Sequence, residues 1–335
     1  MTILEHVSLS ELTTLRVGGL ARYVLVCTSR ADIEEAVRFC ELHALPFTVL
    51  GGGSNVLAND SGFSGAVLRI DIQGCNYTEE GEHILVTAGA GVAWESLVEA
   101  VTTRALWGIE NLAGIPGTVG AAPVQNIGAY GTELKNIFSS ATVYDAKMHV
   151  WSTYTLDDCV FSYRDSVFKH NKSLVIAEVT FSFIKKGSPQ LGYSDLRTLE
   201  RDGKDTSTSH NIATYVREIR SHKFPNLDDV GTAGSFFKNP ILSSEDFLEL
   251  CNRFGSIPSF PVAAGVKIPL AFILDHILHL RGYQKGKVSL YGNQPLVLVV
   301  ETGATAREVD EFAKEIEKKV FDATHIRVER EVQKI

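Results

Sequence analysis

The sequence predicts a mixed α/β protein built from more than one domain. Strand and helix signals alternate along the first third of the chain, a polar stretch at 187–208 interrupts this pattern, and a second αβ region follows it. The chain has 335 residues, which is enough for two to three domains of about 150 residues each. Hydrophobic residues make up 44% and charged residues 21% of the chain, as in ordinary globular proteins.

The first third opens with a βαβ-like unit. A strand is predicted at 21–26, and Ser29 then caps a helix whose apolar residues recur every three or four positions (Ile33, Ala36, Val37 and Cys40). The other elements predicted here are strands at 46–50, 66–72 and 84–88 and a helix at 92–106.

The later elements are divided by the polar stretch. Strands are predicted at 138–146, 174–184, 233–238, 295–301 and 324–332, and helices at 209–222, 243–253, 268–281 and 305–320. Residues 187–208 contain three glycines and a Ser/Thr run but few apolar residues. We therefore expect this stretch to form a mobile excursion or a domain junction.

Charge and composition exclude several function classes. The 32 basic and 40 acidic residues give a net charge of −8, whereas a broad nucleic-acid face needs clustered positive charge. No apolar run approaches the ~20 residues that span a bilayer, and the start of the chain does not read as a signal peptide. The five scattered cysteines and ten histidines show no metal-ligand spacing, so we expect no metal and a reducing, cytoplasmic setting.

Three glycine-rich turns within the first 131 residues suggest a bound cofactor. Residues 51–55, Gly-Gly-Gly-Ser-Asn, follow a strand and could bind phosphate through backbone N–H groups, although a plain tight turn explains them equally well. Residues 89–91 form the second turn. Residues 113–131 are rich in small residues and almost uncharged, which suits a backbone that packs against a flat ligand or, alternatively, a buried connection. Together the turns favour a pyrophosphate-containing cofactor with a planar ring.

Three single residues are candidates for the chemistry. Arg164, in Ser-Tyr-Arg-Asp-Ser, could hold a carboxylate or a developing enolate, and its alternative is a surface ion pair. Ser235 follows a glycine and precedes two aromatic residues, so it could present its hydroxyl to a cleft or simply bond to the backbone. Glu331 shares one face of the predicted C-terminal strand with Arg327 and Glu329, and such a charged face is usually only solvated.

Taken in order, these segments resemble the UDP-N-acetylenolpyruvoylglucosamine reductase family, also called the UDP-N-acetylmuramate dehydrogenases. The resemblance runs from about residue 14 to residue 332 and rests on the segments LGGGSNVL, AGIPGTVGAAPVQNIGAYG, SYRDS, AGSFFKNP and EREV. Tyr193, in LGYSDL, matches the tyrosine of a mobile loop that only one of the two subclasses carries. The chain therefore resembles the tyrosine-loop subclass.

The resemblance implies a fold and a reaction. The implied fold is an FAD-binding fold of the vanillyl-alcohol-oxidase type, with two α/β subdomains, and a third α/β domain that binds substrate. The implied reaction reduces UDP-N-acetylglucosamine enolpyruvate to UDP-N-acetylmuramate, with FAD as cofactor and NADPH as reductant. This step belongs to peptidoglycan synthesis in the cytoplasm, and so to cell wall biogenesis, cell shape, cell division and the cell cycle.

The resemblance also implies a division of the chain. Residues 14–186 would bind FAD, with a split near residue 72 and with the C-terminal strand 324–335 returning to this part. Residues 187–208 would form the mobile tyrosine loop, and residues 209–323 the substrate-binding domain. We expect a small nucleotide-sugar substrate, no nucleic-acid or membrane partner, and a monomer.

Roles for single residues follow by motif. Arg164 would lie beside the substrate carboxylate, Ser235 would donate the proton, and Glu331 would lie near the enolpyruvyl group. The residues expected to bind FAD are Gly51, Gly52, Gly53, Ser54, Asn55, Gly114, Ile115, Pro116, Gly117, Gly120, Ala121, Gln125, Asn126, Gly128, Ala129 and Tyr130. The residues expected to bind the UDP-sugar are Tyr193, Lys223, Asn239 and Gln294.

Two segments of the third domain depart from the family pattern, which leaves the details of the UDP pocket open. The departing residues are Pro269, Ala271, Phe272 and Tyr291. Two other functions stand as alternatives. Another flavin oxidase or dehydrogenase on this framework would keep the FAD turns but not the three catalytic residues together, and a non-catalytic nucleotide-sugar-binding protein would have lost its flavin.

Overall fold

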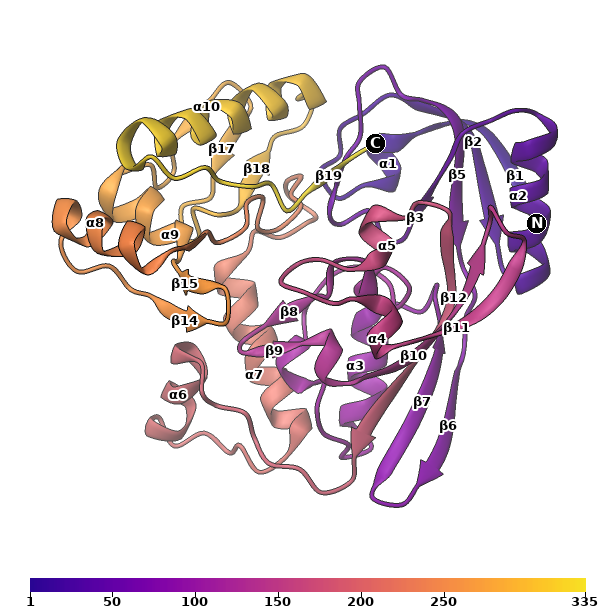
Figure 1. The fold of residues 1–335 in the computed structure, drawn as a ribbon, viewed down its shortest axis with the longest axis horizontal. Helices are drawn as coiled ribbons and strands as arrows, with labels where there is room; N and C mark the ends of the chain where they lie inside the picture. The colour runs from indigo at the N-terminus through magenta and orange to yellow at the C-terminus, as the bar shows by residue number, and fades with distance from the viewer. The chain divides into compact units, whose positions relative to one another are not determined.

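The computed structural model describes residues 1–335, which form two compact units (Figure 1). Unit 1 consists of Met1–Val7, Ala21–Gly53 and Phe63–Arg220, and unit 2 of Ser8–Leu20, Ser54–Gly62 and Ser221–Ile335. Unit 2 therefore takes two short segments from the first 62 residues in addition to the C-terminal third. None of the helices combines the length and the hydropathy that crossing a membrane requires.

Unit 1 contains a four-stranded sheet in the order β1 (Thr2–Ser8), β2 (Leu20–Cys27), β5 (Phe63–Ile70) and β3 (Phe47–Leu50). Strands β2 and β3 both run parallel to β5, and helix α2 (Arg30–Leu42) connects β2 to β3. The helix begins with a capping box formed by Ser29 and Asp32 and buries the four apolar residues predicted for it. The βαβ prediction is thus confirmed.

The second sheet of unit 1 is antiparallel. Its order is β11 (Val150–Thr155), β10 (Phe138–Asp145), β12 (Leu174–Ile184), β7 (His83–Gly89) and β6 (Cys75–Glu80). The central strand β12 is buried on both faces: Val175 and Ala177 pack in the core that includes α2, whereas Ile176 packs in the core that includes α3 (Trp94–Thr102) and α7 (Ser209–Lys223). Burial on both faces explains the uninterrupted apolar run Leu174–Ala177 at the start of this strand.

Short elements complete unit 1. They are β8 (Gly128–Ala129), β9 (Thr132–Glu133), α4 (Leu156–Cys159), α5 (Val167–His170), α6 (Ser194–Arg201) and the 3-10 turns Glu110–Leu112, Ala122–Gln125 and Leu134–Asn136. Helix α6 lies inside the polar stretch 187–208 and was not predicted. It forms because Leu196 and Leu199 pack into the core of unit 1 while its other side chains stay polar.

Unit 2 has one core, covered by its longest helix, α10 (Ala306–Thr324). Val309, Phe312 and Ile316 of α10 share this core with the sheet β16 (Gln284–Lys285), β17 (Val288–Leu290) and β18 (Leu298–Val300) (Figure 1). The other elements are α1 (Leu9–Leu12), β4 (Val56–Leu57), β13 (Ile241–Leu242), α8 (Ser244–Phe254), β14 (Phe260–Val262), β15 (Gly265–Lys267), α9 (Leu270–Phe272), a π-helical turn Ile273–Ile277 and β19 (Gln333–Lys334).

Several predicted elements of unit 2 are wrong in extent. The segment 233–238 is not a strand, because its consecutive Phe236 and Phe237 are both buried and only isolated bridges pair it. The predicted strand 324–332 is irregular: Arg330 forms an isolated bridge with Phe237, and the regular pairing comes after it, where Gln333–Lys334 (β19) run parallel to β4. The helix predicted at 268–281 is instead the short α9 and the π-helical turn.

Candidate active site

The three glycine-rich turns predicted from the sequence converge in unit 1. A Cβ atom on Gly52 would lie 2.8 Å from Gly117 Cα, and one on Gly120 would lie 2.5 Å from Ala90 Cβ. A backbone hydrogen bond also joins the second pair of turns, because Gly120 N–H donates to Ala90 O at 2.9 Å. These glycines are therefore needed for the turns to pack against one another.

The uncharged segment 113–131 is buried or half-buried except at Pro116 and Gly131, and it is anchored to helix α3. The indole Nε1 of Trp94 donates to Leu112 O at 2.9 Å, and the backbone N–H of Trp94 donates to Gly117 O at 3.0 Å. Glu95, the next residue of α3, accepts from Gly114 N–H at 2.5 Å. The first turn of α3 thus sets the course of the segment over residues 112–117.

Arg164 is fixed against the same segment. Its backbone is left-handed, with φ +56°, and its Nη2 donates to Gly128 O at 2.6 Å. Two further bonds tie the neighbouring turn to the segment: Ser166 Oγ donates to Val124 O at 2.7 Å, and the fully buried Asn126 donates to Ser162 O at 3.0 Å. These bonds hold a guanidinium group at the edge of an uncharged surface.

A second arginine, Arg220 of α7, lies beside the segment and was missed by the sequence analysis. Its Nε donates to Gly114 O at 2.9 Å, and the Tyr130 hydroxyl is one of its hydrogen-bond partners. Burial lowers the pKa of the Arg220 guanidinium; interaction with Tyr130 opposes this effect, and the nearby cation of Arg164 adds to it. Burial also raises the pKa of the Tyr130 hydroxyl to about 12, so this hydroxyl stays protonated at neutral pH.

Tyr193 lies on the same side of unit 1. Its ring meets that of Tyr130 edge to face, with the ring centroids 5.4 Å apart, and its side chain is only partly exposed. Asn111, almost fully buried, connects the two regions because its Nδ2 donates to Tyr130 O at 3.0 Å and to Gln190 O at 2.9 Å. The tyrosine loop is thus attached to the backbone of the 113–131 segment.

The other catalytic candidates lie together in unit 2. Gly234 turns the chain with φ +70° immediately before Ser235. The next residue, Phe236, accepts from Glu331 N–H through its carbonyl at 2.9 Å, so Ser235 and Glu331 stand on adjoining segments. Glu331 is buried rather than solvated, contrary to the expectation for a wet strand face, because the alternation of exposed residues that includes Arg327 and Glu329 stops at Glu331 and Val332, which are both buried.

The remaining residues predicted for binding also have defined places in unit 2. Asn55 Nδ2 donates to Glu331 O at 3.2 Å, whereas Gly51–Gly53 belong to unit 1. Asn239 Oδ1 accepts from Leu270 N–H at 2.9 Å and so holds the start of α9. Gln294 lies in the turn beside Ser235, where its Oε1 accepts from Leu296 N–H at 3.4 Å. Lys223 ends α7 and lies in unit 2.

Comparisons with known proteins identify the family. Residues 21–153 match the family model described as "FAD binding domain", and residues 225–335 match that of "UDP-N-acetylenolpyruvoylglucosamine reductase, C-terminal domain". The chain is 36% identical to the UDP-N-acetylenolpyruvoylglucosamine reductase of Amoebophilus asiaticus and 38% identical to that of Ralstonia nicotianae, in each case over 99% of both chains. The chain belongs to the UDP-N-acetylenolpyruvoylglucosamine reductase family.

Solved structures agree with this assignment at the level of the fold. A UDP-N-acetylenolpyruvylglucosamine reductase from Thermus caldophilus aligns over 100% of this chain and 99% of its own, with a TM-score of 0.69 and 22% identity. The 6-hydroxy-D-nicotine oxidase of Arthrobacter nicotinovorans aligns over 90% of this chain and 80% of its own, with a TM-score of 0.51 and 13% identity. Membership of the reductase family confirms the resemblance, the predicted fold class and the predicted enzyme class.

The residues of unit 1 fit FAD, which the match of residues 21–153 confirms as the cofactor. The segment 113–131 offers a buried, uncharged backbone surface, and Arg164 and Arg220 place two cations near it. Such an environment suits a planar ring system that gains negative charge on reduction. No group of three or more His, Cys, Asp or Glu side chains within residues 1–335 is arranged to hold a metal ion.

Proposed function

We propose that this protein reduces UDP-N-acetylglucosamine enolpyruvate to UDP-N-acetylmuramate in peptidoglycan synthesis, with NADPH as the reductant. The observation that carries the proposal is the match to curated reductases of that name over 99% of the chain, including every segment that bears a candidate catalytic residue. The packing of Arg164 onto the 113–131 segment, and of Ser235 beside the Glu331 segment, supports the same function.

Within this proposal, FAD is held by the glycine-rich turns. The turn 51–55 and the segment 114–130 supply backbone N–H groups and an uncharged surface, and Arg164 and Arg220 supply positive charge near it. Bound there and reduced by NADPH, FAD would supply the hydride for the terminal enolpyruvyl carbon. The protein contributes position and electrostatics to that step.

The three catalytic candidates act on the enolpyruvyl group. Arg164 binds the substrate carboxylate, and its guanidinium stabilises the negative charge that develops there when the double bond is reduced. Ser235 Oγ holds the proton that the carbon next to the carboxylate receives. The buried carboxyl group of Glu331 hydrogen-bonds to the enolpyruvyl group and orients it.

Substrate binding is assigned by motif to four residues. Tyr193 covers the bound nucleotide sugar, while Lys223, Asn239 and Gln294 contact its UDP moiety. Since Asn239 Oδ1 already accepts from the start of α9, its Nδ2 is the group left for the substrate. The departing residues 269–272 begin this same helix, so they shape the pocket through Asn239.

The domain roles and the cellular setting belong to the proposal as well. Residues 14–186 bind FAD together with the C-terminal segment 324–335, residues 187–208 form the tyrosine loop, and residues 209–323 bind substrate. The enzyme acts in the cytoplasm as a monomer, without nucleic-acid or membrane partners.

A single assay tests the function. The purified protein, loaded with FAD, is mixed anaerobically with NADPH and UDP-N-acetylglucosamine enolpyruvate, and the products are analysed by mass spectrometry. We expect one UDP-N-acetylmuramate, heavier than the substrate by two hydrogens, for each NADPH consumed. NADPH consumption that does not depend on the nucleotide sugar would contradict the proposal and favour another flavin oxidoreductase.

A further inference from the structure

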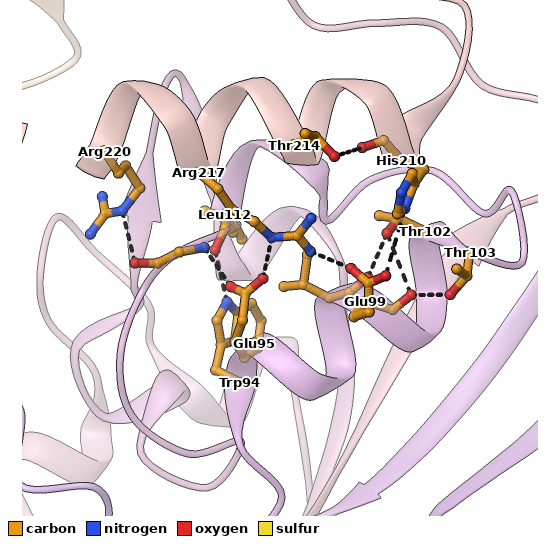
Figure 2. A network of polar contacts seen from close by, with 12 residues as sticks. Trp94, Glu95, Glu99, Thr102, Thr103, Leu112, His210, Thr214, Arg217 and Arg220 are labelled. Carbon is orange, nitrogen blue, oxygen red and sulfur yellow. Dashed lines mark hydrogen bonds and ion pairs between the residues drawn. The ribbon is translucent and has the colours of Figure 1, made fainter. Parts of the chain in front are cut away.

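Glu95 of α3 is bound at both of its carboxylate oxygens. Oε2 accepts from Gly114 N–H at 2.5 Å, and Oε1 accepts from Arg217 Nε of α7 at 2.5 Å. Figure 2 shows Glu95 pointing from α3 toward Arg217, which also reaches Glu99 one turn further along α3. One carboxylate thus joins the 113–131 segment to helix α7.

Gly114 is held from two sides as a result. Its N–H is bound by Glu95 of α3, and its carbonyl accepts from Arg220 Nε of α7 at 2.9 Å. Its φ is +69°, and a Cβ atom there would lie 3.1 Å from Arg220 Cδ. The peptide groups around Gly114 therefore have little room to rotate unless both helices move.

Arg217 and Arg220 are three residues apart on α7, so they lie on the same face of the helix. Arg217 forms ion pairs with both Glu95 and Glu99, and these two contacts fix the position of α7 along α3. The position of α7 in turn sets where Arg220 meets Gly114 and Tyr130. The Glu99 side chain contacts only α7, through Arg217 and His210. The Glu95 side chain binds both α7 and the backbone of the 113–131 segment.

We propose that Glu95 is a positioning residue for the cofactor site: it fixes the Gly114 turn and, through Arg217, the placement of Arg220. This inference rests on the proposed function, because it assigns the 113–131 segment and Arg220 to FAD. Glu95 itself does not take part in the chemistry.

The substitution Glu95→Gln tests this role with little change of shape. A carboxylate can accept from both Gly114 N–H and Arg217 Nε, but the glutamine side chain has one acceptor oxygen and an NH₂ group that only donates. One of the two donors must therefore face another donor. In Glu99→Gln, the matched control on the same helix face, one acceptor oxygen is enough to keep the hydrogen bond from Arg217, and the substitution alters only the longer 3.9 Å contact with His210.

The test measures FAD release from the holoenzyme after dilution, followed by flavin fluorescence, together with the thermal unfolding midpoint. We expect Glu95→Gln to release FAD at least tenfold faster than wild type, and Glu99→Gln to stay within twofold, with similar unfolding midpoints for the two variants. Glu95→Asp keeps the charge but shortens the reach, so it should also release FAD faster.

Two outcomes would overturn the inference, and they are distinguishable from a failure of the proposed function. Release at the wild-type rate in both Glu95 variants would remove Glu95 from the cofactor site. Equal acceleration in Glu95→Gln and Glu99→Gln would reduce its role to general helix packing. A wild-type protein that carries no FAD would instead refute the proposed function, and the inference with it.

Discussion

At the scale of single residues, Ser235 is proposed to act in only one of the two half-reactions, so a substitution there distinguishes them. NADPH reduction of FAD needs no proton from Ser235, whereas product formation needs one at the carbon beside the carboxylate. Ser235→Ala removes one hydroxyl and leaves the buried Phe236 and Phe237 in place. We expect stopped-flow flavin reduction to stay within a few-fold of wild type, and reoxidation by substrate to fall by the ~10²–10⁴-fold typical of losing a general acid.

A structural role for Ser235 would give a different result. Equal and small effects on both half-reactions, or a loss of bound FAD, would indicate a serine that only bonds to the backbone. A variant that reoxidises at a near-normal rate would exclude Ser235 as the proton donor. Traces of both half-reactions on one preparation decide among these outcomes.

Gly120 tests whether the convergence of the glycine turns is needed for FAD binding. An added Cβ would lie 2.5 Å from Ala90 Cβ and 3.1 Å from Ala90 Cα, so Gly120→Ala must push two backbone segments apart. We expect it to destabilise the fold by about 1–3 kcal/mol in denaturant unfolding and to lower the FAD content of the purified protein. Gly192→Ala is the control, because a Cβ atom there has nothing within 4 Å.

Motifs identified the catalytic candidates but not the residues that position them. Arg164, Ser235 and Glu331 stand in short sequence patterns with recognisable chemistry. Arg220 and Asn111 do not, because their roles come from contacts with segments 106 and 79 residues away. The one available signal for Arg220 was a charged residue three positions after Arg217 in a predicted helix, which a solvated helix face explains equally well.

At the scale of elements, the tyrosine loop is attached at its base and exposed at its tip. Asn111 holds Gln190, and α6 buries Leu196, while Tyr193 between them remains 39% exposed. Tyr193 can therefore change position without unfolding the loop. We expect Tyr193→Ala to raise KM for the nucleotide sugar more than it slows flavin reduction by NADPH. An unchanged KM in steady-state assays would show that Tyr193 does not cover the substrate.

Helix α10 gives a prediction for pH-dependent stability. Glu315 accepts from Lys285 Nζ at 2.6 Å and from the Tyr283 hydroxyl at 2.5 Å, and these two contacts lower its pKa from 4.5 to about 2. A carboxyl group with a lowered pKa stabilises the folded state above its unfolded pKa, and this stability is lost as the pH falls toward the folded value.

We therefore expect Glu315→Gln to cost about 1 kcal/mol of unfolding free energy at pH 7, a value reduced by solvent screening, and almost nothing near pH 2. Urea unfolding of wild type and variant across this pH range measures the difference. Glu311→Gln, which breaks an exposed pair with Arg307, is the control and should have a much smaller effect throughout. A Glu315 effect that did not change with pH would contradict the prediction.

Elements with a strong burial pattern were predicted, and three exposed strands at sheet edges were not. Helix α2 and strand β12 show their buried residues directly in the sequence. Strands β1, β6 and β11 lie at sheet edges and are mostly exposed, so no hydrophobic alternation marks them. The segment 233–238 was wrongly predicted to be a strand. Its apolar residues are buried by tertiary packing, and only isolated bridges pair them.

At the scale of the whole molecule, each unit is built from three segments that are not consecutive in the sequence. Ser8–Leu20 and Ser54–Gly62 come from the N-terminal part of the chain, yet they belong to unit 2, where Leu15, Val17 and Leu57 enter its core. Composition changes little at these crossings, so the division expected from the resemblance, in which only residues 324–335 return to an earlier domain, did not include them. The change of unit between Gly53 and Ser54 falls within a segment that the sequence treated as one cofactor turn.

The last prediction concerns how the whole protein retains its cofactor. The segment 113–131 and the turn 51–55 contain no cysteine or histidine, the residues to which flavins are commonly attached. Cys159 is fully buried in the core of unit 1, and burial raises the pKa of its thiol to about 12, so it is inert at neutral pH. We therefore expect a yellow protein that releases all of its FAD into the supernatant when it is denatured with acid. Flavin absorbance that stays with the precipitated polypeptide would demonstrate a covalent bond and would require an attachment residue outside the glycine-rich turns.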